Sequence, residues 1–265
     1  MGVLNVTPDS FSDGGAYFTP EKAIAQALQL EADGADIIDI GGESTRPGAR
    51  PVSCEEEARR VLPVIEQLAK QISRPISIDT RKAQIAKQAI EAGASMINDV
   101  GGLNSDSKII SVAAAAEKAG IIFMHAKGTP QTMQKNPRYR HLLGEIRAFF
   151  LERIHAAENA RISINRIAVD PGIGFGKTLG HNLSIIHQLK SFEDLGVPLM
   201  LGPSRKSFIG RILDLPASER LEGTAAAVAI AVFQGARVLR VHDVKEIKRV
   251  VLISEAIRRQ AAPGA

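Results

Sequence analysis

The sequence predicts a single-domain (β/α)8 barrel, and three observations support this fold class. The chain has 265 residues, close to the roughly 250 that are typical of one such barrel. Short apolar runs alternate with longer amphipathic stretches from one end of the chain to the other, as repeated strand–helix units require. The short runs are rich in Ile and Val and alternate little, which is typical of parallel strands covered on both faces.

Eight of these runs are predicted to be strands. They span residues 3–6, 36–40, 75–78, 95–98, 121–124, 167–169, 199–201 and 238–241. Helices are predicted between and after them, at residues 20–33, 53–71, 82–92, 106–119, 142–160, 225–234 and 245–259. A doubly wound open sheet is the structural alternative, but it usually carries a G-x-G-x-x-G turn after its first strand. That turn is absent here, which favours the closed barrel.

Cap residues support several helix ends. Thr19 and Pro20 suit an N-cap and a first helical position, and Ser53 with Glu56 fits a capping box. Glycines that fit left-handed C-caps follow four predicted helices, at Gly34, Gly93, Gly120 and Gly235. No linker interrupts the pattern, so we expect one domain over residues 1–260 and a disordered tail at 261–265.

Composition argues against several classes of partner. The formal charge is +4, but the basic residues are scattered and form no stripe interleaved with aromatic residues, so nucleic acid is not an expected partner. The longest apolar run, at residues 225–233, is far shorter than the roughly 20 residues that cross a bilayer. Cys54 is the only cysteine. A chain without an internal disulfide suits the reducing cytoplasm, where we expect this protein.

Polar residues follow almost every predicted strand. They are Asn5, Glu43 to Arg46, Asp79, Asn98, His125, Asp170, Ser204 to Lys206, and Arg240 to Asp243. In a barrel, such positions face the catalytic mouth. Asp79 or Asn98 alone could equally be a turn or cap residue, but capping does not explain polar residues at all eight ends. We therefore predict an active site built from these loops.

The residue types indicate the kind of ligand. Asp79, Asn98 and Asp170 could hydrogen-bond the edge of a flat heterocycle, and a buried carboxylate can accept two N–H groups from such an edge. Side chains that are cationic, or that become cationic on protonation, could neutralise an anionic group. They are Arg46, Lys206, Arg240 and His242. The site therefore looks suited to an aromatic head joined to a phosphate.

Three further features carry less information. The segment 172–178 resembles a phosphate-binding P-loop, but Pro171 stands where that motif requires glycine, so we reject a nucleotide triphosphatase. Asp39 lies inside the second predicted strand and could belong either to the barrel core or to the site. His125 could line the pocket, although most histidines here suit surface or loop positions.

Several longer strings resemble one enzyme family. They are N-V-T-P-D-S-F-S-D-G-G at 5–15, G-G-E-S-T-R-P-G at 41–48, I-D-T at 78–80, I-N-D at 97–99, D-P-G-I-G-F-G-K at 170–177, S-R-K-S at 204–207 and R-V-H-D at 240–243. In this order and over essentially the whole chain, they are similar to the dihydropteroate synthases. The first two strings and S-R-K-S are specific, whereas I-D-T or I-N-D alone would be weak.

The resemblance implies a reaction and a set of roles. Such enzymes join para-aminobenzoate to 6-hydroxymethyl-7,8-dihydropterin diphosphate, which gives 7,8-dihydropteroate and diphosphate in folate biosynthesis. Carried over by motif, Asp79, Asn98, Asp170 and Lys206 would bind the pterin. The diphosphate would be bound by Asn5, Thr45, Arg46, Arg240 and His242, with Asn5 holding Mg²⁺. Phe11, Pro47, Phe175 and Ser204 would border the aminobenzoate pocket, where sulfonamides would compete.

The expected chemistry needs no covalent enzyme nucleophile. Neutralised by Mg²⁺, Arg and His⁺, diphosphate is a good leaving group, and the pterin ring can delocalise the methylene cation that remains. We therefore expect an SN1-like step with Lys206, Arg240, His242 and Asp79 as the catalytic group. Family members usually carry residues upstream of the first strand that cover the barrel floor, so here we expect the lower end to be exposed.

Two alternatives share part of the pattern. A pterin-binding methyltransferase barrel would use the same Asp and Asn contacts but would not require the T-R-P-G loop or S-R-K-S. A non-catalytic paralogue would be indicated by loss of Lys206, Arg240 or Asn5, and all three are present. Family members are usually homodimers through helices late in the barrel. The apolar run at 225–233 suits such an interface, although a buried barrel helix is an equal reading.

Overall fold

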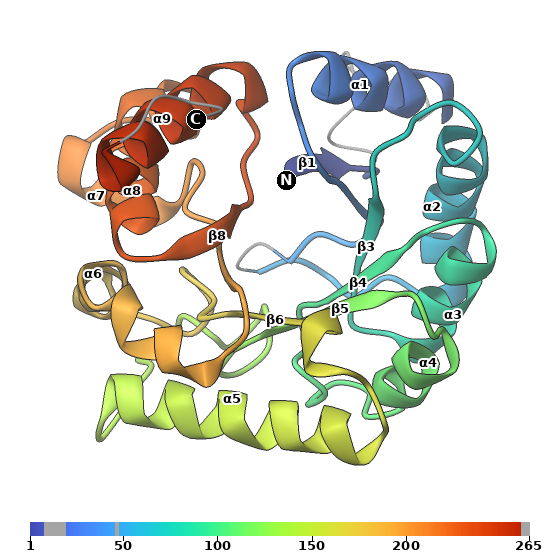
Figure 1. The fold of residues 1–265 in the computed structure, drawn as a ribbon, viewed down its shortest axis with the longest axis horizontal. Helices are drawn as coiled ribbons and strands as arrows, with labels where there is room; N and C mark the ends of the chain where they lie inside the picture. The colour runs from blue at the N-terminus through green and yellow to red at the C-terminus, as the bar shows by residue number, and fades with distance from the viewer. Residues whose placement is uncertain (8–19, 46–47, 261–265) are drawn as a thin grey trace.

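The computed structural model describes residues 1–7, 20–45 and 48–260. Its sheet has eight parallel strands whose order in space is their order in the chain. They are β1 (Gly2–Asn5), β2 (Ile38–Gly41), β3 (Ile76–Thr80), β4 (Met96–Asp99), β5 (Gly120–Met124), β6 (Ile167–Asp170), β7 (Leu199–Leu201) and β8 (Ala236–Leu239). Figure 1 shows these strands ringed by helices. The predicted (β/α)8 barrel is confirmed, and the predicted tail at 261–265 lies outside the described residues.

Backbone hydrogen bonds close the barrel between its first and last strands. Val3 N donates to Val241 O (3.0 Å) and Val241 N donates to Met1 O (3.0 Å). Val241 also forms a parallel bridge with Gly2 just beyond the end of β8. This closure brings the end of β8 beside β1 and β2, so residues at the two ends of the sequence share one mouth.

The helices cover the outside of the sheet. They are α1 (Pro20–Ala32), α2 (Cys54–Leu68), α3 (Ala83–Glu91), α4 (Ile109–Ala115), α5 (Leu142–Asn159), α6 (Leu179–His187), α7 (Ser207–Leu213), α8 (Leu221–Phe233) and α9 (Val244–Arg259). Within the described residues, 3₁₀ helices span Ile164–Arg166, Leu189–Leu195 and Ala217–Glu219. No helix among the described residues is long and apolar enough to cross a membrane.

Two apolar cores hold the barrel together. The larger one fills the layer between the outer face of the sheet and the helices. The smaller one lies inside, where Met1, Ile122 and Met200 are buried and pack against their neighbours. A groove at the amino ends of the strands is lined by Met1 and Val238, among others. Buried polar side chains gather at the carboxyl ends of the strands, among them Asp79, Asn98 and Asp170.

Local predictions failed where several short elements follow one another. The sequence analysis missed α6 and α7 and placed the start of α8 at residue 225 rather than Leu221. The fourth helix is shorter than predicted, and Gly120 opens β5 instead of capping that helix. Gly34, Gly93 and Gly235 do have positive φ angles, as predicted. Predicted strand boundaries otherwise differ from the structure by about one or two residues.

The predicted caps have mixed outcomes. Ser53 Oγ accepts a hydrogen bond from Glu56 N (3.2 Å), but the Glu56 carboxylate binds Arg59 and Arg60. Only half of that capping box therefore forms. A full capping box opens α6 instead, where Thr178 and His181 exchange hydrogen bonds between side chain and backbone. Histidine replaces the usual Glu or Gln there, which explains why the sequence signal was missed. Thr19 lies outside the described residues.

Candidate active site

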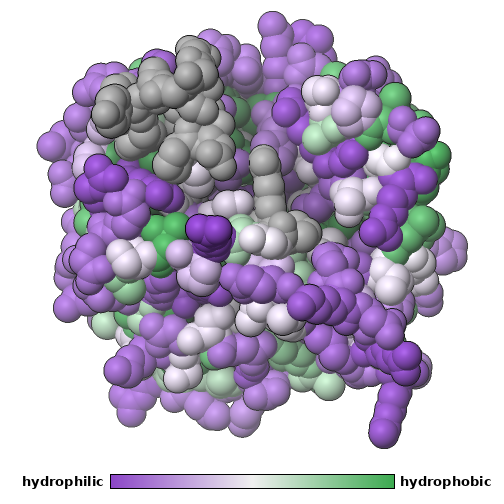
Figure 2. Space-filling view, turned by 180° about the vertical axis from the view of Figure 1, so that it is seen from behind, coloured by the Kyte–Doolittle hydropathy of each residue, from purple (hydrophilic) through white to green (hydrophobic). Residues whose placement is uncertain are grey.

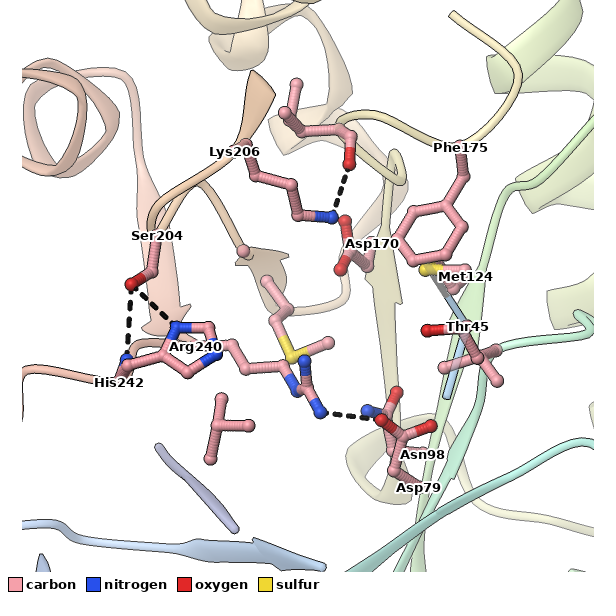
Figure 3. A pocket seen from close by; sticks show the side chains of 15 residues that line it. Thr45, Asp79, Asn98, Met124, Asp170, Phe175, Ser204, Lys206, Arg240 and His242 are labelled. Carbon is pink, nitrogen blue, oxygen red and sulfur yellow. Dashed lines mark hydrogen bonds and ion pairs between the residues drawn. The ribbon is translucent and has the colours of Figure 1, made fainter. Parts of the chain in front are cut away.

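A pocket lies at the carboxyl ends of the strands, where barrel enzymes carry their active sites. Figure 3 shows its side chains converging from separate strand ends. Nine predicted site residues line it, namely Thr45, Asp79, Asn98, Asp170, Phe175, Ser204, Lys206, Arg240 and His242. The sequence analysis missed the apolar part of the lining, which includes Val3, Val100, Met124, Ile173 and Met200. These residues resemble ordinary core positions, so their type alone gave no signal.

Four predicted site residues are not in this lining. Asn5 ends β1, is partly buried and lies in register beside Gly41. Phe11, Arg46 and Pro47 lie outside the described residues.

Arg240 is the centre of the charge network. Its Nε donates to Asp39 Oδ2 (2.6 Å) and its Nη2 donates to Asp79 Oδ2 (2.6 Å). Asn98 Nδ2 also donates to Asp39 Oδ2 (3.2 Å). Burial raises the pKa of Asp79 to about 7, and the neighbouring Arg240 opposes that rise. Burial alone would lower the pKa of Arg240, but the two carboxylates outweigh it and raise that pKa.

The position of Asp39 resolves a choice that the sequence left open. Asp39 is fully buried in β2, beside Val3 and Ser77 in register. It does not line the pocket but supports Arg240 from within the barrel. The available sequence signal was the strand period of two, which places Asp39 on the same face as Gly41. Its Oδ1 has no hydrogen-bond partner among the described residues.

Lys206 occupies the opposite side of the pocket from Asp79. Its Nζ donates to Ile173 O (2.7 Å) and lies 4.1 Å from the centre of the Phe175 ring. Burial lowers the pKa of Lys206 to about 8, although the negative charge of Asp170 opposes this. Burial raises the pKa of Asp170, whose Oδ1 accepts a hydrogen bond from Gly172 N (2.7 Å). The lysine is therefore a cation close to its titration point, held between a carboxylate and an aromatic face.

Ser204 and His242 form a linked pair at the ends of β7 and β8. Ser204 Oγ lies 3.0 Å from His242 Nδ1, and His242 N donates to Ser204 Oγ (3.2 Å). The serine thus fixes both the ring and the backbone of the histidine, as Figure 3 shows. The ring is presented to the pocket from the side opposite Phe175.

Two polar strand ends point elsewhere. Glu43 forms ion pairs with Arg81 and with Lys82 (2.6 Å), and Lys82 also binds the fully buried Glu57. This cluster ties the end of β2 to α2 and α3 instead of lining the pocket.

The other such end is His125, which is buried and is not part of the pocket lining. Its Nδ1 lies 3.0 Å from Lys177 Nζ. Burial lowers the pKa of His125 to about 3 and that of Lys177 to about 7. The sequence gave no sign of this pair, because the two residues lie on different loops.

The described residues contain no group of three or more His, Cys, Asp or Glu side chains that could hold a metal ion. The mouth carboxylates Asp39 and Asp79 are already paired with Arg240.

Comparison with known proteins agrees with this geometry. The model of the family described as pterin binding enzyme matches residues 1–242. A dihydropteroate synthase from Synechocystis is 48% identical over 98% of this chain and 90% of its own length. The Bacillus subtilis dihydropteroate synthase is also 48% identical, over 97% of this chain and 87% of that protein.

Solved structures of dihydropteroate synthases are also similar to this chain. A Yersinia pestis dihydropteroate synthase with a sulfonamide drug has a TM-score of 0.92 and 43% identity, over 97% of this chain and 93% of that chain. A Xanthomonas albilineans dihydropteroate synthase in complex with 7,8-dihydropteroate has a TM-score of 0.88 and 40% identity, over 99% and 93% of the two chains. The fold and the pocket thus define a pterin-binding barrel enzyme.

The chain belongs to the pterin-binding enzyme family, and within it to the dihydropteroate synthases. Its activity is alkyl transfer in folate biosynthesis. The methyltransferase alternative is not favoured by any of the relatives named above.

The two titrating groups of the pocket predict a bell-shaped pH dependence of kcat/KM for the pterin substrate. Below about 7, Asp79 becomes protonated and loses its capacity to accept two N–H groups, so kcat/KM falls. Above about 8, Lys206 loses its charge and kcat/KM falls again. Initial rates at low pterin concentration across a buffer series measure this. A flat profile from about pH 5 to about pH 9 would contradict the assignment.

Proposed function

We propose that this pocket condenses para-aminobenzoate with 6-hydroxymethyl-7,8-dihydropterin diphosphate and releases 7,8-dihydropteroate and diphosphate. One observation carries the proposal. Hydrogen-bonding groups that suit a heterocycle (Asp79, Asn98 and Asp170) share a single pocket with basic side chains that suit an anionic leaving group (Arg240 and His242).

Asp79, Asn98, Asp170 and Lys206 bind the pterin in this proposal. Buried carboxylates accept N–H groups in charge-assisted hydrogen bonds, and the low local dielectric strengthens them. Asn98 Oδ1 is buried without a hydrogen-bond partner among the described residues. An orphaned acceptor of this kind costs free energy until a ligand donor satisfies it.

The diphosphate lies against Arg240 and His242, with Thr45, Arg46 and Asn5 completing its site. Asn5 is suited to be a Mg²⁺ ligand. Its side chain has no hydrogen-bond partner among the described residues, and amide oxygens are among the ligands that bind Mg²⁺. Mg²⁺ commonly takes few protein ligands and completes its shell with phosphate oxygens and waters. When bound, it would neutralise charge on the leaving diphosphate.

The aminobenzoate lies against Phe175 and Ser204 in this proposal. The family motifs also assign Phe11 and Pro47 to it, and both lie outside the described residues. The ring of Phe175 offers a flat apolar surface beside the Lys206 cation. A Xanthomonas albilineans relative has been solved with 4-aminobenzoic acid, at 43% identity and a TM-score of 0.91. A Yersinia pestis relative has been solved with a sulfonamide drug, and we expect sulfonamides to compete with aminobenzoate in this chain.

The reaction then proceeds by dissociation. The carbon–oxygen bond to diphosphate breaks, and the bond pair leaves with the diphosphate toward Arg240 and His242. The methylene cation is delocalised into the pterin ring, which Asp79 and Asp170 hold in place and whose positive charge they stabilise. The aniline nitrogen attacks this carbon with its lone pair, and the resulting ammonium releases one proton to solvent. Lys206, Arg240, His242 and Asp79 form the catalytic group, and exclusion of water keeps the cation from being trapped.

The direct test incubates the enzyme with dihydropterin diphosphate, labelled para-aminobenzoate and Mg²⁺. We expect labelled dihydropteroate and diphosphate in equal amounts, and loss of both when the metal is chelated. Lys206→Ala should lower kcat/KM by about 100-fold or more, because it removes a preorganised charge from the pocket.

Lys190→Ala is the matched control, because Lys190 is exposed on Leu189–Leu195, away from the pocket. The control should keep the wild-type rate. Product formed at the wild-type rate by Lys206→Ala would disprove the assigned role, and no product from the unmodified enzyme would disprove the reaction.

We also propose that the enzyme is a homodimer through α7, α8 and α9. Large apolar side chains are exposed on these helices, namely Ile212, Leu213, Ile230, Phe233, Leu252, Ile253 and Ile257. Figure 1 places the three helices together on one side of the molecule. In Figure 2, hydrophobic side chains gather along the right edge, on that same side. Exposed apolar patches of this kind commonly mark interfaces.

Sedimentation velocity tests the dimer. Phe233→Glu should shift the protein to the monomer, because it buries a charge in the apolar interface. Leu151→Glu on α5 is a matched control, since Leu151 and Phe233 are both 49% exposed. A monomeric wild-type protein at micromolar concentration would refute the interface, as would equal disruption by the two variants.

The cytoplasm is our proposed location. Cys54 is free in the structure, and the chain has no second cysteine with which it could form an internal disulfide. Such thiols suit a reducing compartment.

A further inference from the structure

The loop between β5 and α5, residues 125–141, touches two other loops of the mouth. On one side it meets the chain that follows β2. Gly48 N donates to Pro130 O (2.9 Å), and Gln131 Nε2 donates to Ala49 O (2.8 Å). These contacts are made at Gly48 and Ala49, in the chain between β2 and α2.

On its other side the same loop holds the chain that follows β6. Gln134 Nε2 donates to Gly174 O (2.6 Å) and Tyr139 OH donates to Gly176 O (2.9 Å). The two glutamines are three positions apart, yet they bind segments that lie more than 120 positions apart in the sequence.

The turn that carries the glutamines is internally braced. Thr132 N and Met133 N both donate to Thr129 O (2.9 and 2.7 Å), and Thr129 N donates to Thr132 Oγ1 (3.0 Å). Met133 is only 4% exposed, so the turn is also anchored by an apolar side chain. Because the turn is rigid, a shift of the chain bound by Gln131 would also move the chain bound by Gln134.

The chain after β6 is tightly packed against the loop that carries this turn. The Phe175 carbonyl accepts a hydrogen bond from the buried Lys177 (3.0 Å). A Cβ atom added at Gly176 would lie 2.2 Å from the Lys127 carbonyl oxygen, so the two loops are in direct backbone contact. Phe175 therefore lies on a segment with little freedom to shift.

Figure 3 shows where these contacts lead. Phe175, Met124 and Thr45 lie along one side of the pocket, opposite Ser204 and His242. We propose that the turn at 129–134 is a strap that sets the spacing between the chain at Gly48 and Ala49 and the wall segment carrying Phe175, with Gln131 and Gln134 as positioning residues for the aromatic amine. This inference rests on the proposed assignment of the Phe175 wall to aminobenzoate.

Loss of the strap should affect the binding of the two substrates unequally. Asp79 and Asn98, two of the groups proposed to hold the pterin, lie on β3 and β4 and outside the segments that this loop holds. A loosened wall would weaken the fit of the aminobenzoate ring more than it weakens pterin binding. A role in general stability would instead affect both substrates alike.

The test is the double variant Gln131→Met/Gln134→Met, which keeps side-chain size and charge but removes both N–H donors. We expect KM for aminobenzoate to rise about three- to tenfold, the equivalent of one or two modest hydrogen bonds. KM for dihydropterin diphosphate should rise less than KM for aminobenzoate, and the urea midpoint of unfolding should stay unchanged. Gln67→Met is the matched control, because Gln67 is exposed on α2 and its side chain has no hydrogen bond among the described residues.

Phe175→Ala separates the two ways in which this account can fail. If Phe175→Ala raises KM for aminobenzoate but the double glutamine variant does not, the strap is refuted and the pocket assignment stands. Equal increases in both KM values of the double variant also refute the strap. If Phe175→Ala leaves KM for aminobenzoate unchanged, the pocket assignment fails and the strap fails with it.

Discussion

The ion pairs of Arg240 with Asp39 and Asp79 are the constraint on which the rest of the site depends. Asp39 is fully buried, and an unpaired carboxylate in that position would carry a large desolvation penalty. Arg240 lies 201 positions further along the chain than Asp39 and reaches it only because β8 returns beside β1. Barrel closure therefore supplies the charge balance of the mouth, and an open sheet with the same strands would lack it.

The guanidinium of Arg240, shared by Asp39 and Asp79, also affects how charge is distributed in the pocket. Burial raises the pKa of Asp79 to about 7, the charge of Asp39 adds to that rise, and Arg240 opposes it. On the other side of the pocket, Lys206 lies over the Phe175 ring and interacts with the negative charge of Asp170. The pocket therefore holds carboxylates suited to a heterocycle together with cations suited to a leaving anion. Both are needed for a dissociative transfer.

The sequence was enough to predict the barrel and most of the pocket, for a physical reason. Parallel strands bring their carboxyl ends to one edge, so polar residues after strands are gathered whatever their distance along the chain. Asp79, Asn98, Asp170 and Lys206 follow that rule. The rule fails where a polar residue after a strand pairs with a charged side chain outside the pocket. Glu43 pairs with Lys82 in this way, and neither residue type nor spacing predicts that ion pair.

Other features depend on tertiary contacts that leave no local pattern. The burial of Lys177 beside His125 and the bracing of the 129–134 turn join loops that are distant in sequence. α6 and α7 are short and follow glycine-rich or polar loops, so helical periodicity is weak over them. Asp39 could be placed only once the register of β1, β2 and β3 was known.

The most direct test of the central claim is the pH dependence of pterin affinity in Asp39→Asn. This change removes a negative charge that raises the pKa of Asp79, and it frees Arg240 to interact with Asp79 alone. Asp79 should then stay ionised to lower pH, so the acid-side loss of pterin affinity should move to lower pH than in the unmodified enzyme. An unmoved or upward-shifted transition, in a variant that still binds pterin at pH 8, would contradict the shared-guanidinium account.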